Sequence, residues 1–292
     1  MADAPALASA LAPAKVNLFL HVGPLDADGY HPLASLVAFA DVGDRISVAP
    51  ADGLSLTVTG PFAAGLDGEG DNLILRAVRA LADETGLPEP GLAFTLDKRL
   101  PIAAGLGGGS SDAGAALKLA RDALNLSMDD QALAGVAALI GADGPMCLHA
   151  SAAWAEGRGD RLAFEPALPP LPAVLINPGV PSPTGAVYRG YDAGPPATAD
   201  RPAPPSDWSL SSVLDWLAAQ RNDLQPPALA LQPAIGAALQ AAADLPQVRL
   251  SRMSGSGATV FALFDSEAEA TLAADRLAAQ RPEWWVRTTV LS

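Results

Sequence analysis

The sequence predicts an α+β protein of two domains. Segments with the two-residue alternation of strands are mixed with segments of helical spacing, without a strict repeat of βα units. A Pro-rich stretch, Glu165–Pro172, favours irregular backbone and sets the expected boundary near residue 165, giving domains 1–165 and 166–292. The chain has 292 residues, 50% of them hydrophobic, which is enough apolar material for one large or two small cores. Disorder as the main state is therefore excluded.

In the first domain, residues 15–22 alternate between an apolar face and a face that carries Lys15 and Asn17. This pattern is typical of a half-buried strand, in which residues two apart face the same side at roughly 6.6 Å. The same alternation predicts strands at 54–58 and 92–96, and helical spacing predicts helices at 72–81, 112–124 and 129–140.

In the second domain, the patterns predict strands at 173–177, 258–264 and 285–291. Helices are expected at 211–220, 227–243 and 267–280. A further Pro-rich stretch, 190–207, predicts an exposed excursion between these elements.

The charge balance restricts the classes of partner. The chain has 18 Lys and Arg against 32 Asp and Glu, a formal net charge of −14 at pH 7. This is the wrong sign for broad binding to nucleic acid or to anionic lipid, so neither partner is expected. The longest apolar run, 133–142, is about half of what a membrane span requires.

Cysteine usage and the N-terminus indicate the compartment. Cys147 is the only cysteine, so the chain forms no intrachain disulfide, and no metal cluster is expected with its three scattered histidines. Asp3 stands where a signal peptide needs positive charge, and Pro13 and Lys15 interrupt the apolar run. We therefore expect a short frayed N-terminal extension and a cytoplasmic location.

The most informative segment is a glycine-rich loop at 101–111 that leads into an Ala/Leu-rich helix. Glycines let backbone N–H groups approach a ligand, and Ser110 or Ser111 can cap the helix, with Asp112 in its first turn. A helix start offers unpaired N–H donors and about half a positive charge, which suits a phosphate. The plain alternative is a flexible turn before a capped helix.

Two common phosphate-binding motifs do not match this loop. A P-loop needs a lysine after its last glycine, and none follows Gly109. A dinucleotide fingerprint that starts at Gly105 has Ser110 where its third glycine belongs.

The pattern P-x-x-x-G-L-G-G-G-S-S before a helix resembles the nucleotide loop of the GHMP kinases, a family of small-molecule kinases. Five further segments follow in the family's order: AKVNLFL at 14–20, GYH at 29–31, GADGP at 141–145, RNDL at 221–224 and MSGSGAT at 253–259. Together they resemble the branch of the family that acts on a cytidine-diphosphate-linked methylerythritol. The resemblance implies a first domain like domain 2 of ribosomal protein S5 and a ferredoxin-like second domain.

The implied reaction transfers the γ-phosphoryl group of ATP to the 2-hydroxyl of that acceptor, in the non-mevalonate route to isoprenoid precursors. The resemblance makes Lys15 and Asp143 catalytic. Lys15 would stabilise charge at the transferred phosphoryl group, and Asp143 would take the proton of the acceptor hydroxyl. By sequence alone, Lys15 is as readily a strand-end lysine, and an aspartate in Gly-Ala-Asp-Gly is more often a turn residue that bonds to its own backbone.

The resemblance also implies the binding residues. His31 would bond to the cytosine edge while a tyrosine ring stacks on the base, with Tyr188 as the second aromatic. The substrate-binding set is Asn17, Tyr30, His31, Thr184 and Tyr188. The ATP-binding set is Asn72 and Lys98 toward the adenosine, with the loop residues Pro101, Ile102, Ala103, Ala104, Gly105, Leu106, Gly107, Gly108, Gly109, Ser110 and Ser111.

Mg²⁺ is expected with ATP, and Ser111 is a candidate ligand, although no resident metal site is predicted. The segment Ser254–Gly257 is expected to support the substrate or the loop. The sequence departs from the family's pattern after Asp143, where Gly144, Met146 and Cys147 stand at positions that usually carry β-branched, proline and aromatic residues. Alternative functions are a GHMP kinase with a homoserine or sugar acceptor and a noncatalytic nucleotide-dependent sensor, although a sensor needs no catalytic base.

Overall fold

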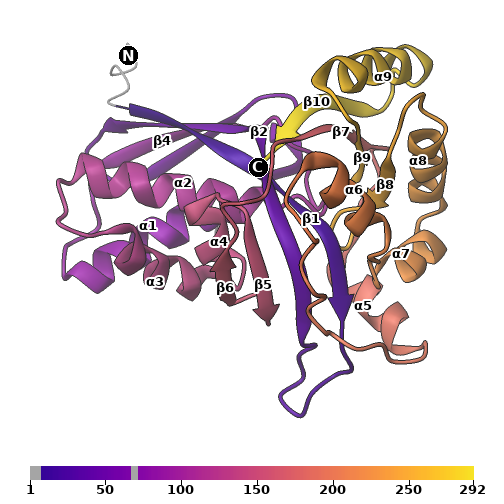
Figure 1. Ribbon diagram of the computed structural model, residues 1–292. Helices are drawn as coiled ribbons and strands as arrows, with labels where there is room; N and C mark the ends of the chain where they lie inside the picture. The colour runs from indigo at the N-terminus through magenta and orange to yellow at the C-terminus, as the bar shows by residue number, and fades with distance from the viewer. Residues whose placement is uncertain (1–7, 67–71) are drawn as a thin grey trace. The chain divides into compact units, whose positions relative to one another are not determined.

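The computed structural model describes residues 8–66 and 72–292 (Figure 1). This part of the chain forms two compact units that both contain strands and helices, which confirms the α+β class. Unit 1 comprises residues up to 14, 42–102 and 107–150, and unit 2 comprises 15–41, 103–106 and 151–292. The chain therefore crosses between the units several times, and a single boundary near residue 165 stays a prediction.

Unit 1 combines a small sheet with a set of helices. Strand β4 (Leu92–Asp97) pairs in parallel with β3 (Ser55–Thr59) and antiparallel with the second half of β2 (Leu33–Pro50). The helices are η1 (Ala63–Leu66), α1 (Leu73–Thr85), α2 (Gly108–Ala123), α3 (Asp130–Ile140) and α4 (Gly144–His149). Strand residues such as Phe94 and helix residues such as Leu117 share one buried core.

The helix boundaries in unit 1 follow from local sequence signals. The side chain of Asn72 accepts a hydrogen bond from Ile74 N at the start of α1, and Gly86 ends that helix with φ 67°. Asp129 caps α3 in the same way through Ala132 N. Such caps satisfy N–H groups that a helix leaves unpaired, and a left-handed glycine is a common helix end.

Unit 2 is built on an antiparallel sheet in the order β10-β7-β9-β8, and the first half of β2 pairs with β5. Its strands are β5 (Ala153–Gly157), β6 (Arg161–Phe164), β7 (Leu171–Asn177), β8 (Leu250–Met253), β9 (Val260–Leu263) and β10 (Trp285–Leu291). Its helices are α5 (Thr184–Asp192), α6 (Leu210–Ala218), α7 (Gln225–Leu231), α8 (Pro233–Ala243) and α9 (Glu267–Gln280). All seven residues of β7 are buried, which agrees with its apolar run.

Two expectations from the sequence need correction, and one long strand went unpredicted. Strand β1 (Ala8–Val22) begins well before residue 15, so residues 8–14 belong to a strand and not to a frayed extension, and residues 1–7 lie outside the described residues. The helix expected at 227–243 is two helices, because Pro233 lacks an N–H group and restricts the backbone of Gln232 before it. The long strand β2 was not predicted.

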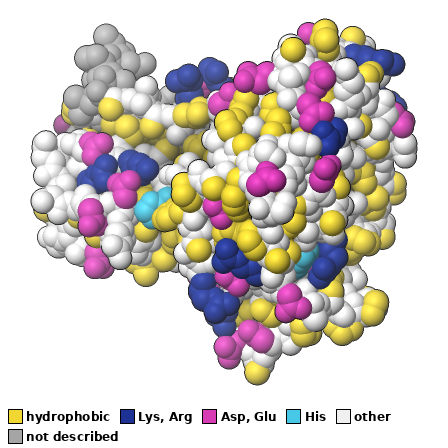
Figure 2. Space-filling model, viewed as in Figure 1, with side chains coloured by type: hydrophobic (Ala, Val, Ile, Leu, Met, Phe, Trp, Pro, Cys, Tyr) yellow, Lys and Arg dark blue, Asp and Glu magenta, His cyan; other side chains and the backbone are white. Residues whose placement is uncertain are grey.

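Charged side chains of both signs are interspersed on the face of the molecule that Figure 2 shows. Several arginines are paired with carboxylates, among them Arg121 with Asp122 and Asp130, and Arg249 with Asp215 and Asp265. Across residues 8–66 and 72–292, no helix is long and apolar enough to cross a membrane.

Candidate active site

The glycine-rich loop leads into helix α2 in unit 1. The helix begins at Gly108, and Gly107 precedes it with φ 61° and no side-chain cap. Ser110 and Ser111 therefore lie inside the first turn, which corrects the expectation that one of them caps the helix. Ser111 N donates to Gly107 O at 2.9 Å. The start of this 16-residue helix offers the N–H donors and the partial positive charge that favour phosphate.

Residues 103–106 of the loop belong to unit 2, where the segment Ser254–Gly257 holds them. Ser254 Oγ donates to Gly105 O at 2.9 Å, and Thr259 N donates to Ala104 O at 3.0 Å. A Cβ on Gly105 would lie 2.3 Å from Ser254 O. This segment therefore supports the loop directly, as the sequence suggested.

Lys15 and Asn17 lie next to this part of the loop. Lys15 is buried, and its backbone N–H donates to Leu106 O at 2.8 Å. The Asn17 backbone N–H donates to Ser254 Oγ at 3.1 Å, while its side-chain amide donates to Ser35 Oγ at 2.8 Å. Unit 2 thus brings together Lys15 and Asn17, residues 103–106 of the loop and the Ser-Gly segment.

Asp143 lies in unit 1, immediately before α4, with helical backbone and no side-chain cap. A Cβ on the following residue, Gly144, would lie 2.1 Å from Ala137 O. Close packing of α4 on α3 therefore explains why glycine replaces the usual β-branched residue. Lys15 and Asp143 belong to different units, so their approach to each other stays a prediction.

The aromatic candidates meet around His31 in unit 2. Its ring centroid lies 5.1 Å from that of Tyr188 and 5.6 Å from that of Tyr191. Nδ1 contacts Gly23 O at 2.9 Å, and Nε2 contacts Asp192 Oδ1 at 3.2 Å. Both ring nitrogens therefore face oxygen atoms, which fixes the imidazole. Sequence analysis missed Tyr191 and Asp192, and only their places on the same helix as Tyr188 could have indicated them.

Tyr30 and Thr184 have different surroundings in the same unit. The Tyr30 ring is half exposed, with the guanidinium carbon of Arg158 3.9 Å from its centroid, and Arg158 also pairs with Asp28 at 3.0 Å. Thr184 Oγ1 lies 2.9 Å from Ser256 Oγ, which joins α5 to the Ser-Gly segment.

The two residues expected near the adenosine both have partners within unit 1. Asn72 uses its side chain to cap α1, as described above. Lys98 is buried, and its Nζ lies 2.6 Å from Asp44 Oδ2 and 2.7 Å from Asp112 Oδ2. Their role toward ATP stays a prediction, and the Lys98 ammonium is engaged by carboxylates of the protein.

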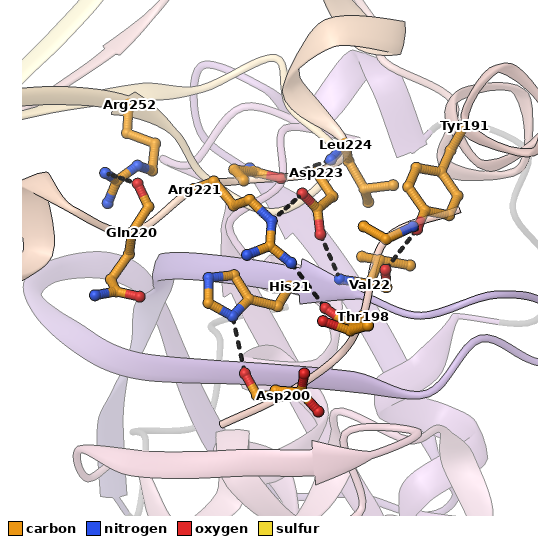
Figure 3. Close-up of polar contacts among 12 residues, drawn as sticks. His21, Val22, Tyr191, Thr198, Asp200, Gln220, Arg221, Asp223, Leu224 and Arg252 are labelled. Carbon is orange, nitrogen blue, oxygen red and sulfur yellow. Dashed lines mark hydrogen bonds and ion pairs between the residues drawn. The ribbon is translucent and has the colours of Figure 1, made fainter. Parts of the chain in front are cut away.

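The Pro-rich stretch 190–207 is attached to unit 2 along strand β1 (Figure 3). His21 Nδ1 lies 3.0 Å from Asp200 O, and Arg221 Nη2 donates to Thr198 O at 2.7 Å. Tyr191 Oη donates to Val22 O and accepts from Ala197 N at 3.2 Å. His21 and Arg221 thus bind the backbone of this stretch, and Tyr191 ties its beginning to β1, so its path is specified although it contains no helix or strand beyond the end of α5.

Comparison with known proteins relates this arrangement to one family. Residues 72–151 match the model of the GHMP kinases N terminal domain, and residues 209–283 match that of the GHMP kinases C terminal domain. The chain is 55% identical over 287 residues to 4-diphosphocytidyl-2-C-methyl-D-erythritol kinase of Caulobacter vibrioides strain NA1000, covering 97% of this chain and 99% of the relative. The chain belongs to the 4-diphosphocytidyl-2-C-methyl-D-erythritol kinase family, within the GHMP kinases.

Further comparisons agree with this assignment. A kinase of the same name from Dinoroseobacter shibae is 49% identical, covering 96% of this chain and 93% of the relative. A crystal structure of 4-(cytidine 5'-diphospho)-2C-methyl-D-erythritol kinase superposes with a TM-score of 0.78 at 35% identity, covering 98% of this chain and 99% of that one. The expected two-part GHMP kinase fold is therefore confirmed.

Proposed function

We propose that the protein transfers the γ-phosphoryl group of ATP to the 2-hydroxyl of 4-diphosphocytidyl-2-C-methyl-D-erythritol, giving the 2-phosphate and ADP. The proposal is carried by sequence identities of 55% and 49% to kinases of this name, over 97% and 96% of this chain. The cluster of His31 and Tyr188 in unit 2 supports it, because aromatic and imidazole rings suit a cytosine base. We place the reaction in the bacterial cytoplasm, a reducing compartment in which the thiol of Cys147 stays reduced.

Phosphoryl transfer needs positioning and charge stabilisation more than covalent chemistry by the protein. The loop 101–111 and the start of α2 bind the phosphates of ATP through backbone N–H groups. Asp143 takes the proton from the acceptor hydroxyl, and Lys15 stabilises the negative charge on the transferred group. Asn17, Thr184, Tyr30, His31 and Tyr188 hold the acceptor, and Asn72 lies toward the adenosine.

Mg²⁺ accompanies ATP in this proposal and neutralises phosphate charge when bound. Mg²⁺ prefers oxygen ligands and is usually held by one or two protein groups together with the phosphates. In the structure, Ser111 Oγ is buried and has no hydrogen-bond partner among the described residues, so this hydroxyl fits such a ligand.

An ADP-release assay with three acceptor conditions tests the proposal. ADP release with the cytidine-linked acceptor, and not with homoserine or galactose, is the expected result. Release with homoserine or a sugar instead would indicate a different GHMP kinase. ATP binding without ADP release under any condition would indicate a sensor.

A further inference from the structure

A buried network of one cation and two carboxylates lies beside the start of α2 in unit 1. Lys98 Nζ bonds to Asp44 Oδ2 at 2.6 Å and to Asp112 Oδ2 at 2.7 Å. The side chains of all three residues are at most 4% exposed. Separating the partners of a buried ion pair leaves an uncompensated charge, which is strongly destabilising. Such a network therefore holds the segments that carry its residues in fixed positions.

The network joins the chain on both sides of the loop. Before the loop, Asp44 Oδ1 accepts hydrogen bonds from Arg99 N at 2.6 Å and from Leu100 N at 2.8 Å. After the loop, Asp112 is the fifth residue of α2, just past the first turn in which the sequence placed it, and a Cβ on Gly108 would lie only 3.2 Å from Lys98 Nζ. The ends of the loop are therefore held by one buried ammonium.

The charges of the network do not balance. Burial disfavours the charge of Lys98, but the two carboxylates outweigh this effect and raise its pKa, so the ammonium stays charged. Burial raises the pKa of Asp112 to about 7; the ammonium opposes this shift, whereas Asp44 adds to it. Asp112 Oδ1 is also buried without a hydrogen-bond partner among the described residues.

We propose that Lys98, Asp44 and Asp112 are positioning residues for ATP, which fix the two ends of the glycine-rich loop and act on the nucleotide through its backbone. The inference rests on the proposed function only in taking ATP as the ligand of the loop. Lys98 was expected to contact ATP directly. Its ammonium already has two short bonds to buried carboxylates, so in this proposal Lys98 acts on ATP only through the backbone of the loop.

The test measures binding of a non-hydrolysable ATP analogue by calorimetry, with no acceptor present. Lys98→Met leaves two buried carboxylates without a cation and is expected to weaken binding about tenfold. Adding Asp112→Asn to this variant neutralises one of them and is expected to bring the affinity back to that of Asp112→Asn alone, about threefold below the wild type, since residues in one network are not additive. If the ammonium touched ATP directly, the double variant would bind as weakly as Lys98→Met, and the proposal would be overturned.

The single variant Asp112→Asn keeps the test decisive if Lys98→Met fails to fold. Positioning predicts weaker analogue binding by about threefold, because α2 loses its charged anchor while Asp44 keeps its bond to Lys98. A direct contact predicts unchanged or tighter binding, since Lys98 is then less restrained, and this outcome refutes the proposal.

A matched control is available at the other end of the same helix. Arg121 pairs with Asp122 and Asp130 near the end of α2, far along the helix from the loop. Arg121→Met should leave the affinity for the analogue unchanged. The KM for the cytidine-linked acceptor should also stay unchanged in Asp112→Asn, which a general loss of structure would not allow. Failure of the proposed function would show separately, as absence of ADP release in the wild-type protein.

Discussion

Replacing Gly105 by alanine tests whether the glycine-rich loop depends on its contact with the Ser-Gly segment. Gly105 has φ +73°, and an added Cβ would lie 2.3 Å from Ser254 O and 2.9 Å from Gly257 O. A left-handed conformation costs a residue with a Cβ about 1–2 kcal/mol. Overpacking against backbone atoms adds about 1–3 kcal/mol. Gly105→Ala is therefore expected to destabilise the protein by about 2–5 kcal/mol.

Thermal unfolding followed by circular dichroism measures this effect. At about 2–4 °C per kcal/mol for a chain of this size, the midpoint should fall by about 4–20 °C. Gly109→Ala is the matched control, because Gly109 is helical and its Cβ would meet only Leu73 Cδ1, at 3.1 Å. Alanine is the better helix former by about 0.5–1 kcal/mol, so this variant should be as stable as the wild type or more so. A Gly105→Ala protein with the same unfolding midpoint as the wild type would refute the argument.

Four further outcomes are expected. Asp143→Asn should lower kcat by about 10²–10⁴, the usual contribution of a positioned base, and near-normal turnover would remove Asp143 from this role. Tyr188→Ala should raise the KM for the cytidine-linked acceptor more than that for ATP, since stacking contributes ~1–3 kcal/mol per base. Asp192→Asn removes the charge that faces His31 and should raise the same KM by about two- to fivefold, as expected for a partly exposed pair. Burial lowers the pKa of His21 from 6.5, so the unfolded chain takes up protons first, and stability should fall as the pH drops below 6.5. His21→Asn should flatten this part of the pH profile in urea titrations, and an unchanged profile would contradict the assignment.

Local sequence patterns predicted the elements whose signals are complete within a few residues. Helix α9 and strand β10 have the expected bounds because their caps and periodicity are local. Strand β2 was missed because it runs through 18 residues that interact with different partners along their length, including β4 and β5. No single pattern of alternating apolar and polar residues describes such a strand.

In the candidate site too, features with local sequence signals were predicted and contacts between distant residues were not. The loop 101–111, the family motifs and the residue types proposed for the acceptor site are all visible in the sequence, since they depend on backbone freedom and chemistry at short spacing. The pairing of Lys98 with Asp44, of Gly105 with Ser254 and of His31 with Asp192 links residues far apart in the chain.

By itself, the sequence determined the family, the α+β class and the position of the glycine-rich loop. Only the tertiary structure decided that Lys98 is bonded to two buried carboxylates and that the Ser-Gly segment holds the loop. The physical reason is that a charged side chain is buried only where folding brings its partners, and no short-range pattern specifies which distant residues these are.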